Sequence, residues 1–215
     1  MNPQLMHNLL VGHSTLEVLQ EYGLVIAGQN NNGITACRIV DAGDKRYRIE
    51  TPVGAANGHA FNALNVPMQS EEQNGVTMVV LPALNGLTLP AIGGPSIMVT
   101  GQLSGCSFVY QPRNDGSVKV AHIQPGQRVG GGEANPKIAT SGMSLAMDLS
   151  HSGKFVGSTD DVNVFGSNYY QHQHNDGVSR CTVLGIRRLN GWNFYAQIYT
   201  QQGRSVKTAV QFFGN

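Results

Sequence analysis

Short apolar runs, either alternating with polar residues or rich in β-branched side chains, make up most of the chain after residue 23. Gly, Asn, Asp and Pro separate these runs, which is the pattern of strands joined by turns. Leucines recur at helical spacing through residues 4–21 and predict an amphipathic helix, broken near Gly12. Two further apolar stretches, 54–65 and 137–149, are interpreted as short helices. The pattern predicts strands at 24–27, 34–40, 45–50, 76–81, 96–100, 102–111, 117–123, 181–188, 192–200 and 205–212.

The bulk composition describes one ordered globular domain that spans residues 1–215. Hydrophobic residues make up 40% of the chain and charged residues 13%, whereas a disordered chain has low hydrophobicity and high charge. A net charge of +1 gives no field that attracts a nucleic acid or an anionic membrane surface. We therefore expect neither of these partners, no cofactor, and a monomer.

The three cysteines, Cys37, Cys106 and Cys181, cannot all pair with one another, and none has a second cysteine at metal-finger spacing. A compartment that keeps thiols reduced fits this count best. The first residues lack a basic segment followed by an apolar one, and no apolar run has membrane-spanning length. We expect a chain made in the cytoplasm, without a classical signal peptide or a membrane span.

Tight reversals are predicted at 113–116 and 189–191, where Asn and Gly accept a positive φ. The first reversal joins the two strands that carry Cys106 and His122. Opposed residues of a hairpin have a constant sum of residue numbers, and a loop within 113–116 gives sums near 228 or 229. Cys106 and His122 sum to 228, so we expect them opposite each other or one step off register, with the sulfur within reach of the ring.

A cysteine and a histidine placed in this way suit nucleophilic catalysis, because the imidazole lowers the thiol pKa and later carries the proton to a leaving group. Gly105 allows a sharp backbone turn, and the N–H groups around Ser104, Gly105 and Cys106 are candidate donors to an oxyanion. Thr100 is the candidate third group that fixes the imidazole. Six residues of straight strand span about 20 Å, so Thr100 joins the site only if the chain bends at Gly101 or Gly105.

The same cysteines and histidine also have a purely structural interpretation. A half-buried cysteine in a strand usually acts as a small hydrophobe, and this is our interpretation of Cys37 and Cys181. A histidine alone is mostly a satisfied or surface side chain. By spacing alone, packing is therefore the preferred interpretation of Cys106 and His122, and catalysis is the alternative.

Other polar groups give weaker signals. His172 and His174 would face one side of a strand, with His151 nearby, but no carboxylate or cysteine completes a metal set at a recognisable spacing. A polar surface segment is the preferred interpretation, and no metal site is predicted. The acidic pairs at 71–72 and 160–161 are interpreted as solvated, and the three glycines at 130–132 as a flexible loop.

The segment Val99-Thr100-Gly101-Gln102-Leu103-Ser104-Gly105-Cys106, together with His122, resembles the active-site signature of the cytotoxic necrotizing factor catalytic domains and of Burkholderia lethal factor, their compact single-domain relative. The resemblance covers residues 97–123. It implies that Cys106 is the catalytic cysteine, His122 its histidine, and Thr100 the threonine of the compact branch. The fold that it implies is α+β, a β-sandwich of two mixed sheets flanked by helices and long loops.

Members of that group are bacterial toxins that deamidate a glutamine of a host protein, a Rho-family GTPase in one branch and a DEAD-box translation initiation helicase in the other. The resemblance thus implies an effector made in the bacterial cytoplasm and delivered to the host cytosol, which converts glutamine to glutamate through a thioester. If an amine replaces water, the product is a transglutamination. Two alternatives stay open: a cysteine peptidase or acyltransferase, which uses the same dyad, and a non-catalytic β-sandwich binding module.

Overall fold

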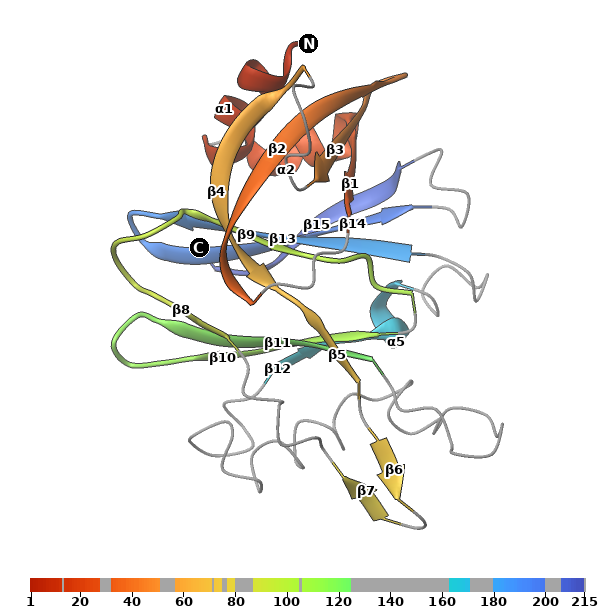
Figure 1. The fold of residues 1–215 in the computed structure, drawn as a ribbon, viewed down its shortest axis with the longest axis vertical. Helices are drawn as coiled ribbons and strands as arrows, with labels where there is room; N and C mark the ends of the chain where they lie inside the picture. The colour runs from red at the N-terminus through yellow and green to blue at the C-terminus, as the bar shows by residue number, and fades with distance from the viewer. Residues whose placement is uncertain are drawn as a thin grey trace.

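Most of the chain that the structure describes is β-strand, arranged in the computed structural model as two main sheets with two helices on one side (Figure 1). The described residues are 1–12, 14–27, 32–50, 57–70, 72–74, 77–79, 87–104, 106–124, 163–170, 180–199 and 206–214. Several predictions lie outside these residues, namely the helix at 137–149, the loop at 130–132, and the side chains of Glu71, His151, Asp160, Asp161, His172 and His174. No helix among the described residues is long and apolar enough to cross a membrane.

Two short helices begin the chain where one broken helix was predicted. α1 spans Pro3–Val11 and α2 spans Thr15–Glu21. The Asn2 side chain caps α1 by accepting a hydrogen bond from the Leu5 amide at 2.8 Å. The expected break at Gly12 is confirmed: a Cβ there would lie 3.0 Å from the Asn8 carbonyl oxygen, so glycine suits the point where the chain leaves α1.

The larger sheet has eight strands in the order β1-β3-β2-β4-β9-β13-β14-β15. It is mixed, because β1 with β3 and β4 with β9 are parallel pairs and the other pairs are antiparallel. The bounds are β1 Gly23–Ile26, β2 Gly33–Gly43, β3 Arg46–Glu50, β4 His59–Val66, β9 Ile97–Thr100, β13 Arg180–Arg188, β14 Gly191–Tyr199 and β15 Val206–Phe213.

The smaller sheet has five strands in the order β12-β10-β11-β5, with β8 also paired to β11. It is mixed too, because β5 runs parallel to β11. Its strands are β5 Met68–Ser70, β8 Leu87–Leu89, β10 Ser107–Pro112, β11 Val118–Gln124 and β12 Asn163–Phe165. The short helix α5, Ser167–Tyr170, follows β12, and β6 Glu72–Asn74 pairs with β7 Thr77–Val79 as a separate two-stranded sheet.

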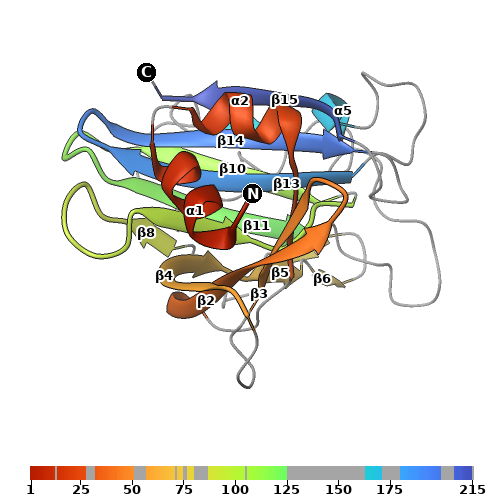
Figure 2. The same ribbon diagram turned by 90° about the horizontal axis from the view of Figure 1, so that it is seen from above.

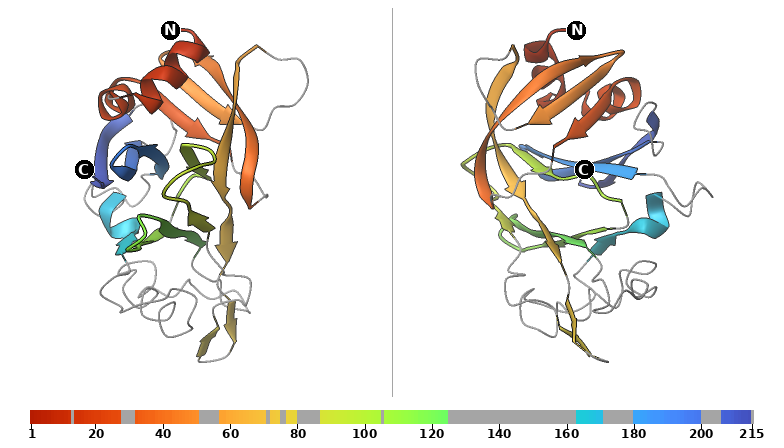
Figure 3. Two further views of the ribbon diagram at one scale, coloured as in Figure 1. Left: turned by 90° about the vertical axis from the view of Figure 1, so that its left-hand side faces the viewer. Right: turned by 45° about the vertical axis from the view of Figure 1, so that its right-hand side comes forward.

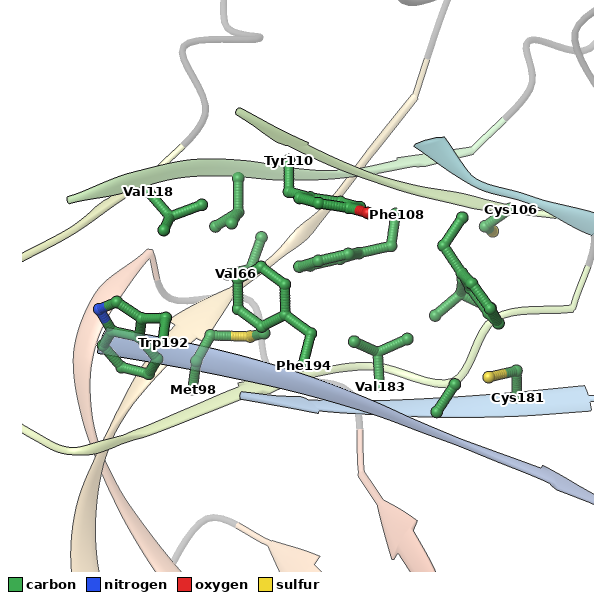
Figure 4. Close-up of a cluster of buried hydrophobic side chains, with 14 of the residues drawn as sticks. Val66, Met98, Cys106, Phe108, Tyr110, Val118, Cys181, Val183, Trp192 and Phe194 are labelled. Atoms are coloured by element: carbon green, nitrogen blue, oxygen red, sulfur yellow. The ribbon is translucent and has the colours of Figure 1, made fainter. Parts of the chain in front are cut away.

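Two apolar cores hold three layers together (Figures 2 and 3). Met6 and Leu10 of α1 and Leu19 of α2 pack on the outer face of the larger sheet, which curls around the helices. The second core fills the space between the sheets, where Phe108 of the smaller sheet meets Phe194 of the larger edge to face at 5.3 Å (Figure 4). The described chain is thus mostly strand with few helices, in a curled mixed sheet and a second sheet, compatible with the expected α+β sandwich.

Every predicted strand overlaps an observed one, but the helix expected at 54–65 is wrong. Its described part forms β4, His59–Val66, which is antiparallel to β2 and parallel to β9. Since β4 has a strand on each side, ladder hydrogen bonds and burial on both faces of its second half outweigh the weak helical pattern of an apolar run.

The hairpin between β10 and β11 has its loop within 113–116 as expected, but its register differs from the expected one. Gly116 donates a backbone hydrogen bond to Arg113, which in turn donates to Ser117, each at 2.9 Å, and Gly116 takes a φ of 78°. This is a type I turn followed by a glycine bulge, and it makes Ser117 the partner of Arg113. Paired residue numbers therefore sum to 230 rather than 228 or 229, as in Phe108 opposite His122.

The chain passes from the larger sheet to the smaller one twice, at neighbouring places. Val66 ends β4 opposite Thr100, and two residues later Met68 begins β5 opposite His122 (Figure 1). Pro67 lies between them, and its missing N–H interrupts the ladder there. The second passage runs from Thr100 to Cys106 and ends where β10 begins. We call residues 66–68 and 100–106 together the double crossing.

Candidate functional site

His122 and Thr100 face each other across the space between the sheets because of where they stand in the strand alternation. On β9, Ile97 and Val99 face the helices, whereas Met98 faces the other sheet, so Thr100 shares the face of Met98. On β11, Val120 lies in the core between the sheets, and His122 is two residues further along. Both polar side chains are 0% exposed.

The Thr100 hydroxyl joins the two sheets. It donates to the Val66 carbonyl oxygen at 2.7 Å, and its oxygen lies 2.8 Å from His122 Nδ1. A hydroxyl has one proton, which Thr100 donates in its hydrogen bond to the Val66 carbonyl oxygen, so Nδ1 must be the donor of the second hydrogen bond. The bend that the sequence required between Thr100 and Cys106 is present, and the contact between Thr100 and His122 follows from it.

This hydrogen bond selects the tautomer of His122. With the proton on Nδ1, the lone pair is on Nε2, which is buried without a hydrogen-bond partner among the described residues. Burial lowers the pKa of His122 from 6.5 to about 4, so the ring is neutral at pH 7. The arrangement presents a buried, oriented and unprotonated nitrogen, which is what a general base requires.

Cys106 lies immediately before β10, at the end of the double crossing. Its side chain is 4% exposed, and its carbonyl oxygen accepts a hydrogen bond from the Tyr170 hydroxyl of α5 at 2.8 Å. Burial raises the pKa of the Cys106 thiol, against the opposite effect of a hydrogen bond with the Ser104 backbone. The expected lowering of this pKa by the imidazole is therefore wrong for the resting site, in which both groups are neutral.

Among the described residues, no direct hydrogen bond joins the Cys106 sulfur and the His122 imidazole, and the register of the hairpin places them diagonally. Because the hairpin sum is 230, His122 lies opposite Phe108, and Cys106 precedes Phe108 by two residues on the same side of the sheet. Diagonal neighbours of this kind are about 7 Å apart. Cys106 and His122 are therefore two positions out of register, and the expectation that they lie opposite each other or one position apart is wrong.

Met68 is the contact of the thiol that the sequence interpretation missed. The Cys106 Sγ donates a weak hydrogen bond to the Met68 thioether sulfur at 3.8 Å. Tyr170 and the Val66 carbonyl oxygen were missed as well. Pro67 signals that the strand before it ends, because proline inside an apolar run marks a strand end, but it does not predict which residues Met68 contacts.

The remaining predicted site residues have separate outcomes. Ser104 is exposed, and its backbone is hydrogen bonded to the thiol. Gly105 lies outside the described residues. Cys37 and Cys181 are both 0% exposed, which is compatible with their interpretation as small hydrophobic side chains.

Among the described residues, this site coincides neither with a cluster of metal ligands nor with the apolar hollow between β10, β12 and β15. Within the described ranges no group of three or more His, Cys, Asp or Glu side chains is placed to hold a metal ion. An apolar hollow of about 450 Å³ opens between β10, β12 and β15, lined by Tyr110, Phe165 and Phe212 among others. Its lining includes none of Thr100, Cys106 and His122.

Replacing Thr100 with valine, which has the same shape but no hydroxyl, is expected to lower the free energy of unfolding by about 3 kcal/mol, because the Val66 carbonyl and the Nδ1 proton lose their buried partner. Urea unfolding at neutral pH measures the change. Thr100→Ser is the matched control: it keeps the hydroxyl and loses a methyl group, for about 1 kcal/mol. Equal losses in the two variants would mean that the hydroxyl does not hold the sheets together.

No protein-family model matches the chain, and no curated protein matches its sequence at a significant level.

Proposed function

We propose that the protein is a glutamine deamidase whose Cys106 thiol attacks the side-chain carboxamide of a glutamine in a host protein. The observation that supports this most strongly is the state of His122, whose Nδ1 is fixed by Thr100 while its buried Nε2 has no partner among the described residues. A buried polar atom without a partner is costly and is frequent at catalytic sites. The Cys106 thiol is the neighbouring group with a proton to give.

In the proposed mechanism, Nε2 of His122 takes the thiol proton as the sulfur bonds to the carboxamide carbon. Backbone N–H groups around Ser104 and Cys106 stabilise the oxyanion. The carbon–nitrogen bond then breaks, and ammonia leaves with the proton from Nε2. Water, deprotonated by the same nitrogen, hydrolyses the thioester and leaves a glutamate side chain and the free thiol.

The neutral resting pair shapes this mechanism. Since burial raises the pKa of Cys106 and lowers that of His122, an ion pair does not form before substrate binds. The thiolate arises only during the attack, as the proton moves to the imidazole. The Thr100 hydroxyl accepts a hydrogen bond from Nδ1–H throughout and keeps the ring in one orientation, which is the role of the third residue in a catalytic triad.

The substrate belongs to the proposal as well. By the resemblance of residues 97–123, the target is a host Rho-family GTPase or a DEAD-box translation initiation helicase, and the protein acts in the host cytosol after delivery from a bacterium. A primary amine in place of the water would give a transglutaminated product.

A host-cell lysate treated with the purified protein tests the proposal. Mass spectrometry is expected to find a glutamine converted to glutamate after treatment with the wild type and not with Cys106→Ser. Cys37→Ala is the matched control, since Cys37 is a buried thiol on the opposite face of the larger sheet, and this variant should convert the same glutamine. Peptide cleavage in place of conversion would instead identify a thiol peptidase, and lysates that do not differ would identify a non-catalytic module.

A further inference from the structure

Cys106 and His122 are buried, whereas Met68, which contacts the Cys106 sulfur, is exposed. The side chains of Cys106 and His122 are 4% and 0% exposed, whereas Met68 is 52% exposed. The Met68 sulfur touches the Cys106 sulfur at 3.8 Å. A substrate carboxamide therefore meets the thiol only after Met68 has moved.

The register shows how Met68 reaches the thiol. Met68 pairs with His122 across one edge of β11, and Cys106 stands at the start of β10 beyond the other edge. The contact between the two sulfurs therefore crosses β11 at the position of His122. The Met68 side chain is unbranched, has three rotatable bonds and rearranges readily.

Methionine and glutamine side chains have the same length and branching as far as their third atom. Each has a Cβ and a Cγ, and methionine then has its sulfur where glutamine has the carboxamide carbon. In this structure that third atom lies 3.8 Å from the Cys106 sulfur, slightly farther than the separation of about 3–3.5 Å at which reacting atoms attack. The Met68 sulfur thus stands near the place that the reacting carbon of a bound glutamine would take.

We propose that Met68 is an internal stand-in for the substrate glutamine, which fills the glutamine side-chain slot and closes the site until a substrate displaces it. This inference rests on the proposed deamidase function for the identity of the substrate. Its structural part, that Met68 covers the thiol, has a separate readout. The slot accepts an unbranched side chain that enters from the β5 edge of the smaller sheet and meets the thiol at its third atom.

The first experiment measures alkylation of Cys106 by iodoacetamide at neutral pH. Met68→Ala is expected to raise the rate by about tenfold or more, because it opens the path to the sulfur. Met68→Leu, which keeps an apolar side chain of similar volume, should stay near the wild-type rate. Cys37 and Cys181 are internal controls, since both are 0% exposed and remain unlabelled while the protein is folded. An unchanged rate in Met68→Ala, or equal labelling of all three cysteines, would overturn the proposal.

The second experiment places a substrate side chain in the slot. In Met68→Gln the introduced carboxamide carbon stands against the Cys106 sulfur, and the chain is expected to deamidate itself at that position. The thiol displaces ammonia and water then hydrolyses the thioester, so the amide becomes a carboxylic acid. Mass spectrometry of the peptide measures the conversion, with the neighbouring Gln69 as the internal reference. The double variant Met68→Gln with Cys106→Ala should convert neither glutamine.

The two experiments separate the two proposals. Faster alkylation of Met68→Ala without self-conversion of Met68→Gln would support Met68 as the cover and contradict the deamidase function. Self-conversion that depends on Cys106 would support both. Unchanged alkylation together with no conversion would leave Met68 as an ordinary surface methionine and refute its role as a stand-in.

Discussion

The His122→Asn variant is expected to lose the proposed deamidase activity by about 10⁴-fold at neutral pH while the protein stays folded. The asparagine amide nitrogen takes the place of Nδ1 and still donates to the Thr100 hydroxyl, which lies 2.8 Å from that position. Nothing replaces Nε2, the atom proposed to take the thiol proton. The rate of glutamate formation on the target protein measures the loss, and urea unfolding at pH 7 shows that the fold persists.

A second variant on the same strand separates chemistry from stability. Val120 is fully buried on the same face of β11, and Val120→Ala removes packing without touching the site. It should cost about 2–3 kcal/mol of stability and leave the rate per folded molecule close to that of the wild type. If His122→Asn kept more than about a tenth of the wild-type rate, His122 would not be the base.

Acidification from pH 6.5 to pH 4 is expected to lower the free energy of unfolding by about 3 kcal/mol through His122 alone. Burial lowers the pKa of His122 from 6.5 to about 4, so over this range the unfolded chain binds a proton that the folded chain does not bind. The stabilisation is therefore complete above pH 6.5 and is lost as the pH falls toward 4. Urea unfolding at a series of pH values measures the decline.

Comparison with His122→Asn isolates this contribution. Burial also lowers the pKa of His7. His7 is present in the wild type and in His122→Asn, so its effect cancels in the comparison. Hydrogen bonds with Lys45 and with Arg38 hold the pKa values of Glu21 and Glu50 below 4.5, so these carboxylates lose their contribution mainly at lower pH. A difference between wild type and variant that stayed constant from pH 6.5 to 4 would contradict a buried neutral imidazole at position 122.

The longer strands of this chain were mostly predictable because their signals are local, whereas β4 and the three-residue strands β5, β6, β8 and β12 were not predicted. Period-two alternation and turn residues located all ten expected strands, and the asparagine and glycine at 190–191 marked a hairpin that forms with Arg188 opposite Gly191. β4 was predicted as a helix because it is a central strand, buried on both faces in its second half. The sequence of such a strand has the same apolar pattern as a buried helix segment.

The candidate site was predictable in its residues and not in its geometry. The signature and the hairpin brought Cys106 and His122 together, yet their register depended on one bulge, at Gly116, that the composition of the turn did not specify. The contact between Thr100 and His122 depended on a bend that residue spacing alone left open. Their roles in a reaction stay predictions.

The contact between Met68 and Cys106 was the least predictable part of the site. It lies on a three-residue strand, 38 residues from the cysteine that it touches. No motif connects the two positions, and only the parallel pairing of β5 with β11 brings them together. Contacts that depend on the pairing of distant strands have no local signal to reveal them.

The double crossing also determines at which stage of folding the contacts of the site can form. The Thr100 hydroxyl meets a carbonyl 34 residues earlier and a ring 22 residues later, and Tyr170 holds a carbonyl 64 residues before it. Each partner pair needs a different strand pairing, and the ring meets the hydroxyl only after one sheet has docked on the other. We therefore expect a partly folded chain to lack the contact between Thr100 and His122, because these residues belong to different sheets and each sheet is closed by pairings of distant strands.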